Sequence, residues 1–174
     1  MLIAVWCFIF FCLGSIVYGS ICYKIGPSVS GRAVQKEVIR LLSEQKNLKK
    51  IIDLGAGFGF FSLRLTKNFP NTLIVSYEVQ IVPFLVMVFL KKLFFKKNWI
   101  IYKQDFFKLK ALDADYVYCY LYTDNEGKIT QFLKDTIVKN TKVISSTFAL
   151  KLKAQYKLTA FDVYQTPIYV YDFN

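Results

Sequence analysis

The chain begins with an unbroken apolar run and then alternates between short apolar segments and polar breaks. Residues 1–23 contain no charged side chain, and most of them are Ile, Val, Leu, Phe, Trp or Cys. A helix of roughly 20 apolar residues is long enough to cross the hydrocarbon core of a bilayer. We therefore expect one transmembrane helix over residues 1–23 and one domain over residues 24–174. The alternative is a buried N-terminal helix in a soluble protein.

Basic residues follow the apolar run directly, beginning with Lys24, Arg32, Lys36 and Arg40. Lys and Arg next to a membrane span tend to stay on the cytoplasmic side. We therefore expect a single-pass membrane protein whose domain lies on the cytoplasmic side or, in an organelle, on the matrix side.

Strand-like and helix-like segments alternate through most of the remaining chain. Helical spacing of apolar residues predicts a helix over residues 32–45, and further helices are expected from residue 60, over 81–95 and over 126–138. Strands are expected at 51–54, 71–78, 99–103, 115–122 and 142–150. Such alternation predicts an α/β fold with a parallel sheet and crossover helices. Two β-rich runs, 155–164 and 167–173, then predict a C-terminal antiparallel hairpin, because no crossover helix separates them.

A glycine-rich turn follows the first expected strand and has the pattern Asp53-Leu-Gly55-Ala56-Gly57-Phe-Gly59. Glycine is needed where the backbone takes positive φ or approaches a ligand closely. The dinucleotide pattern Gly-x-Gly-x-x-Gly does not fit well, since the last glycine comes one position early. Asp53 would also repel a pyrophosphate, whereas it would attract the sulfonium and amino groups of S-adenosylmethionine. A ligand-free turn is the remaining alternative.

Two more acids follow later strands. Glu78, followed by Val79, ends the second strand, and Asp105, followed by Phe106, comes after the third. A carboxylate such as Glu78 can accept both hydroxyls of a ribose. Because ligands of open α/β sheets bind at the carboxyl ends of the strands, we expect the three acids to line one site. Each acid alone could be an ordinary solvated strand-end residue.

The acid-flanked glycine turn resembles motif I of the class I, seven-strand methyltransferases, which use S-adenosyl-L-methionine. Within that class the chain looks like the small protein-lysine methyltransferases whose mitochondrial members carry an N-terminal membrane helix. The resemblance runs from about Gly26 to Phe173. It implies a Rossmann-like seven-stranded methyltransferase sheet, and it implies that the cofactor is bound by Asp53, Gly55, Ala56, Gly57, Gly59, Glu78, Val79, Asp105 and Phe106.

The resemblance also places the fourth strand end, residues 122–125, opposite the methyl group. Tyr122 and Asp124 are the candidate catalytic residues, with the role of orienting the substrate amine. Aromatic packing for Tyr122 and helix capping for Asp124 are the structural alternatives. The chain departs from the family by lacking a proline after Leu121 and another after the fifth strand, so the substrate pocket is poorly specified.

Composition narrows the chemistry and the partners. The chain has no histidine, which excludes a Ser-His-Asp triad and histidine-ligated metal sites, so we expect no metal. The net charge of +11 indicates an anionic neighbour, and an anionic membrane surface explains it together with the expected anchor. Nucleic acid is not favoured, because no RNA-binding motif is visible. The apolar segment 81–95 is expected to be a crossover helix that also touches the membrane.

These observations favour one function and leave two alternatives. The favoured function is methylation of lysine side chains in proteins, with membrane proteins as one class of target and S-adenosyl-L-methionine as the methyl donor. The first alternative is a methyltransferase that acts on a lipid or quinone headgroup. The second is a non-catalytic membrane-bound module with the same fold, which is disfavoured because buried carboxylates without a ligand are costly.

Overall fold

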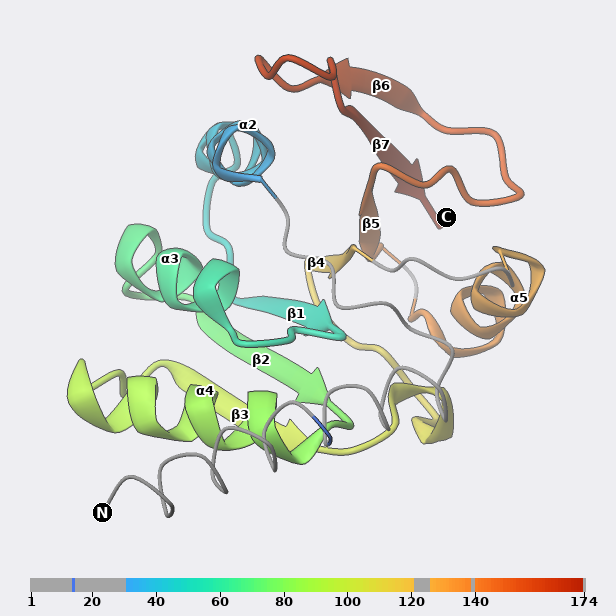
Figure 1. The fold of residues 1–174 in the computed structure, drawn as a ribbon. Helices are drawn as coiled ribbons and strands as arrows, with labels where there is room; N and C mark the ends of the chain where they lie inside the picture. The colour runs from blue at the N-terminus through green and yellow to red at the C-terminus, as the bar shows by residue number, and fades with distance from the viewer. Residues whose placement is uncertain (1–13, 15–30, 121–125, 139, 174) are drawn as a thin grey trace.

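A seven-stranded sheet runs through the computed structural model, which describes Gly14 and residues 31–120, 126–138 and 140–173 (Figure 1). The strand order is β3-β2-β1-β4-β5-β7-β6. The first five strands are parallel, and β7 runs antiparallel to both β5 and β6. The strands are β1 Lys50–Leu54, β2 Leu73–Glu78, β3 Trp99–Lys103, β4 Tyr116–Cys119, β5 Lys142–Ser146, β6 Tyr156–Thr159 and β7 Pro167–Asp172. The predicted mixed sheet with a C-terminal hairpin is confirmed.

Helices cover both faces of this sheet (Figure 1). The described helices are α2 Arg32–Ser43, α3 Phe60–Asn68, α4 Ile81–Leu93 and α5 Glu126–Thr136, with a short 3-10 helix η1 at Phe106–Lys108. Apolar side chains of α2, α3 and α4 form one buried cluster with one face of the strands, including Val38, Leu65 and Met87. Those of α5, with Phe132 and Leu133, form a second cluster on the other face.

Strand β1 shows why the apolar runs become central strands. Residues 51–54 are all buried, because β1 lies between β2 and β4 and both of its faces are covered. Side chains alternate between the two clusters, with Ile51 in the first and Ile52 and Leu54 in the second. The buried carboxylate of Asp53 is the exception in this apolar strand, and it marks the end of the sheet where the glycine-rich turn begins.

The predicted strand over residues 155–164 is too long, since β6 ends at Thr159. The turn that follows is closed by the side chain of Asp162, which accepts hydrogen bonds from the backbone N–H (2.8 Å) and the hydroxyl (2.6 Å) of Thr166. These hydrogen bonds stabilise a turn where the prediction had a continuation of the strand.

Within the described ranges, no helix combines the length and apolar character required to cross a bilayer. The predicted transmembrane helix over residues 1–23 falls outside those ranges except for Gly14.

Candidate functional site

The turn between β1 and α3 lies at the carboxyl edge of the sheet and depends on its glycines. Gly55, Gly57 and Gly59 have φ angles of 70°, 56° and 74°, in the left-handed region that favours glycine. The backbone N–H groups of Gly55 and Ala56 both donate to the carbonyl oxygen of Tyr77 in β2, each at 3.0 Å. The turn is therefore tied to the neighbouring strand through its backbone.

Gly57 and Gly59 have opposite surroundings. A Cβ atom on Gly59 would lie 2.4 Å from Cγ of Met87 and 2.9 Å from Cζ2 of Trp99, so glycine is required there for packing against α4 and β3. A Cβ atom on Gly57 would meet no atom of the described residues within 4 Å. With respect to those residues, Gly57 therefore borders open space above the turn, where a ligand could approach the backbone.

This difference predicts that alanine at Gly59 mainly lowers stability, whereas alanine at Gly57 mainly weakens ligand binding. Gly59→Ala combines a strained φ with a steric clash and should lower the free energy of unfolding by about 3 kcal/mol. Gly57→Ala carries only the backbone strain and should cost about 1 kcal/mol, yet its methyl group enters the ligand space and should weaken ligand binding. Urea unfolding and ligand titration of both variants check this prediction. Equal stability losses in the two variants would contradict it.

Glu78 holds the turn from the end of β2. One carboxylate oxygen accepts a hydrogen bond from the backbone N–H of Gly57, and the other accepts from those of Val79 and Gln80, all at 2.8 Å. The side chain is only 7 % exposed. Burial raises the pKa of Glu78, and the three backbone hydrogen bonds oppose that rise. Glu78 thus contacts the glycine turn directly.

Asp53 is buried at 3 % exposure and ends a chain of polar side chains beneath the turn. The Ser62 hydroxyl donates to its carboxylate, the Ser76 hydroxyl donates to the Ser62 oxygen at 2.8 Å, and the indole N–H of Trp99 donates to the Ser76 oxygen at 2.8 Å. Burial raises the pKa of Asp53 to about 7, and the nearby Glu78 carboxylate adds to this, while the hydrogen bond from Ser62 opposes it.

Ser62, Ser76 and Trp99 are site residues that the sequence analysis missed. Ser76 is paired in register with Asp53 in the neighbouring strand, and Ser62 lies in the first turn of α3. Nothing in the sequence distinguishes these serines from ordinary polar residues, because their connection with Asp53 depends on the strand register and on how α3 packs.

Neither Asp53 nor Glu78 takes part in an ion pair among the described residues, where ion pairs involve only Arg40 and Lys50 as cations. Two buried carboxylates beside one open turn create a negative potential that is costly without a compensating cation. The same potential would repel a phosphate group. The arrangement therefore suits a ligand that brings positive charge to the turn.

The third predicted acid has a local partner. Asp105 follows β3, and its carboxylate accepts a hydrogen bond from the backbone N–H of Phe107 at 3.0 Å, which starts η1. Phe106 is buried in the second core cluster, with its ring centroid 5.7 Å from that of Phe132 in α5. Since β3, β2 and β1 are adjacent and parallel, Asp105, Glu78 and Asp53 belong to neighbouring strand ends.

The candidate catalytic residues Tyr122 and Asp124 lie outside the described residues. Just before them, Cys119 ends β4 and is buried, and burial raises the pKa of its thiol to about 12. A neutral buried thiol is a poor nucleophile. In the part of the chain that the structure describes, no group of three metal-ligating side chains comes together.

No protein-family model and no curated protein matches this chain. Solved structures do match its fold. An RNA methyltransferase from Salinibacter ruber, in complex with S-adenosyl-L-homocysteine, superposes with a TM-score of 0.71 at 17% identity, covering 83% of this chain and 92% of that one. Coclaurine N-methyltransferase, bound to N-methylheliamine and S-adenosylhomocysteine, superposes with a TM-score of 0.53 at 12% identity, covering 69% of this chain and 38% of that one.

A third match is PKMT2 from Rickettsia typhi in complex with S-adenosylhomocysteine, with a TM-score of 0.50, 16% identity, and coverage of 60% of this chain and 22% of that one. The chain spans well under half the length of the second and third proteins. At these identities the likeness shows the fold, which is the seven-strand sheet of S-adenosylmethionine-dependent methyltransferases.

Proposed function

We propose that this chain is an S-adenosylmethionine-dependent methyltransferase. The observation that carries the proposal is the pair of buried carboxylates, Asp53 and Glu78, beside a glycine turn that is open at Gly57 and has no cation partner among the described residues. S-adenosylmethionine carries a sulfonium and an ammonium group against a single carboxylate, and no phosphate, so it brings net positive charge. The S-adenosylhomocysteine held by all three neighbours described above supports the same choice.

The residues present fit this cofactor. Glu78 has three acceptor positions filled by backbone N–H groups, and a carboxylate offers about four, so one remains for a ribose hydroxyl. Asp53 would place negative charge near the sulfonium, while Asp105 would remain available beyond the end of β3 for the base. The cofactor supplies a methyl group already activated by the sulfonium, and the task of the chain is to hold and align the two reactants.

We propose a protein lysine side chain, in a membrane protein, as the substrate. Support comes from the resemblance in the sequence and from the apolar residues 1–23, which would anchor the domain beside such a substrate on the cytoplasmic or matrix side. A lysine must lose its proton before it attacks, and a desolvated pocket promotes this by lowering the pKa of the amine. Tyr122 and Asp124 are proposed to orient that amine.

RNA is a second candidate substrate, and a specific observation favours it. The match to the RNA methyltransferase extends over 92% of that protein, and the net charge of +11 would favour a polyanion. A lipid or quinone headgroup remains the third candidate, since an anchored domain would lie next to both.

One labelling experiment decides among these substrates. The full chain is incubated with methyl-labelled S-adenosylmethionine, membranes and total RNA, and the protein, lipid and RNA fractions are then separated. We expect label in the protein fraction, and acid hydrolysis of that fraction should release it as methyl-lysine. The Glu78→Gln variant serves as the negative control and should transfer no label. Label confined to lipid or RNA would reject the lysine substrate while keeping methyl transfer. Absence of enzyme-dependent label in all three fractions would argue against the activity.

A further inference from the structure

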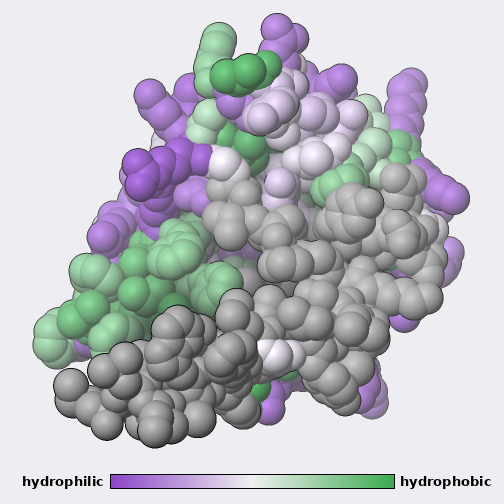
Figure 2. Space-filling model, viewed as in Figure 1, coloured by the Kyte–Doolittle hydropathy of each residue, from purple (hydrophilic) through white to green (hydrophobic). Residues whose placement is uncertain are grey.

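The outer side of α4 carries large apolar side chains that no described part of the chain covers. Ile81, Leu85, Phe89 and Leu93 recur every fourth residue, so they share one face of the helix. Their exposed fractions are 42, 54, 62 and 54 %. We call these four residues the α4 stripe. Figure 2 shows apolar surface gathered over this helix.

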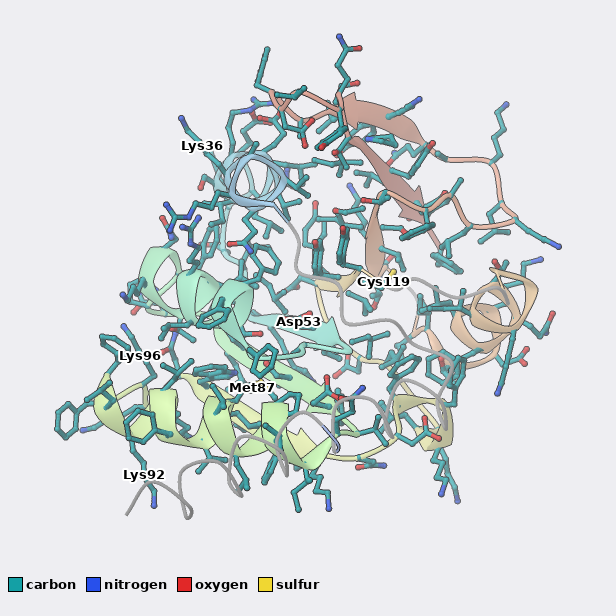
Figure 3. All side chains as sticks on the ribbon, viewed as in Figure 1. Lys36, Asp53, Met87, Lys92, Lys96 and Cys119 are labelled. Carbon is teal, nitrogen blue, oxygen red and sulfur yellow. The ribbon has the colours of Figure 1, made fainter. Side chains whose placement is uncertain are left out.

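Only a narrow side of α4 packs against the hydrophobic core. Pro83 and Met87 are the buried residues of the helix, and Met87 points toward the sheet beside Gly59, whereas Lys92 points away from it (Figure 3). Every residue over 81–90 is nevertheless apolar. A crossover helix that only had to pack on the sheet would be expected to have a polar outer face, so the outer face of α4 is adapted to an apolar neighbour.

The end of α4 contains a residue that costs stability. The backbone N–H of Lys96 donates to the carbonyl oxygen of Lys91, and that of Phe95 donates to that of Lys92, which is the Schellman arrangement. Its left-handed position is usually glycine, yet here it is Phe95, with φ of 49° and an exposed fraction of 87 %. The ring gains nothing from the described chain in return for this backbone strain.

Charge identifies the neighbour. No acidic residue occurs over 79–104, whereas Lys91, Lys92, Lys96, Lys97 and Lys103 lie within it. The ammonium group of Lys67 in α3 lies 4.6 Å from the ring centroid of Phe94, so it adds a cation at the C-terminal end of α4. An apolar helix face with lysines at its rim is the arrangement that binds an anionic lipid surface. A second copy packed parallel on the same face would bring the two lysine groups together, which opposes that dimer.

We propose that α4 docks flat on an anionic lipid bilayer, with the α4 stripe and Phe95 in the acyl boundary and the lysines on the headgroups. This goes beyond the proposed methyl transfer, because docking requires neither cofactor nor substrate. It also differs from anchoring by residues 1–23, because it fixes the orientation of the folded domain against the membrane.

The first test measures whether lipid covers α4 in the full chain. A fluorophore is attached at Phe89→Cys, with the four native cysteines replaced by alanine, and the protein is reconstituted in vesicles containing phosphatidylglycerol. The matched control carries the fluorophore at Lys134→Cys on α5, which covers the opposite face of the sheet. At position 89 we expect doxyl lipids to quench the fluorophore and iodide not to reach it. At position 134 we expect iodide to quench the fluorophore and doxyl lipids to have no effect.

Other outcomes of this test overturn the proposal. If iodide reaches position 89 in vesicles as freely as at position 134, lipid does not cover the helix. Protection without lipid that fades on dilution would identify a second copy as the occupant. Protection without lipid at every dilution would identify another segment of the same chain. Replacing phosphatidylglycerol by phosphatidylcholine should reduce the ratio of docked to undocked protein about fivefold for each lysine that contacts headgroups. Unchanged doxyl quenching at position 89 would show that the lysines do not contribute to docking.

The second test separates docking from folding at Phe95. Phe95→Gly removes the strained side chain and should raise Tm by about 2 to 4 °C. The same change removes an apolar ring from the lipid contact and should lower the ratio of docked to undocked protein about tenfold. A purely structural role for Phe95 would move Tm and leave doxyl quenching at position 89 unchanged, which would remove this residue from the docking surface.

Discussion

Glu78→Gln should weaken the binding of S-adenosylmethionine at least about 100-fold. The Glu78 carboxylate accepts three backbone N–H groups, including that of Gly57. Glutamine offers a single acceptor oxygen and turns an NH₂ group toward some of these donors. A hydrogen bond to a charged acceptor is worth about 1.5–3 kcal/mol, so losing one and disordering the turn accounts for the expected change. Isothermal titration at 25 °C measures it directly.

Two comparisons make this result specific. Glu44→Gln removes an equally charged side chain from an exposed pair with Arg40, where the N–O distance is 2.5 Å, and should leave binding unchanged. Urea unfolding of Glu78→Gln establishes that the variant is folded, with an expected loss of about 2 kcal/mol. A folded Glu78→Gln variant with native affinity would show that the cofactor does not use this turn.

Most of the fold follows from short-range patterns in the sequence. The runs ending at Leu54 and Glu78 are apolar, short and bounded by turn residues, and both are strands as predicted. Strand ends are less predictable. The fifth strand stops at Ser146 because Thr147 takes a φ of 73°, and a β-branched residue gives no warning of such a turn.

The candidate site could be predicted only in part, for a related reason. The spacing of Asp53, the glycines and Glu78 places them at one sheet edge, and the structure brings them together. The partners of these acids are backbone N–H groups and the hydroxyl of Ser62, which in turn accepts from Ser76, and neither serine belongs to a recognisable motif. Tertiary packing decides those contacts, so only the structure shows how each carboxylate is held.

The segment over 81–95 shows another limit of periodicity. Because residues 81–90 are all apolar, no alternation distinguishes a buried face from an exposed one. The sequence therefore allowed both a buried crossover and a membrane contact. The structure shows that Pro83 and Met87 face inward and that the stripe does not, and this asymmetry makes the docking proposal testable.

Asp53→Asn should remove most of the pH dependence of stability that the native chain shows between about pH 4 and 8. The folded pKa of Asp53 is about 7, against 3.8 for an unperturbed aspartate. In this range the folded state binds a proton that the unfolded state has lost, so stability falls as pH rises. At about 1.4 kcal/mol per pKa unit the loss is on the order of 4 kcal/mol. The raised pKa of Glu78 contributes in the same direction.

Urea unfolding at a series of pH values checks this prediction, with Asp113→Asn as the control. Asp113 is largely exposed, at 79%, and among the described residues it forms an ion pair only with Lys50, at 3.4 Å. The Asp113→Asn profile should follow the native one, whereas the Asp53→Asn profile should be flatter and the variant more stable than the native chain at pH 8. Parallel profiles for all three proteins would show that Asp53 titrates normally.

The same variant tests whether the turn selects a cationic sulfur. S-adenosylmethionine has a sulfonium, and S-adenosylhomocysteine has a neutral thioether at the same place. In the native chain, ionisation of Asp53 near pH 7 should strengthen binding of the first ligand more than the second, because opposite charges attract in a buried site. The ratio of the two affinities should therefore rise with pH in the native chain and stay constant in Asp53→Asn. If the ratio is independent of pH in both proteins, the carboxylate does not act on the sulfonium, and its buried hydrogen bond with Ser62 would then serve the fold alone.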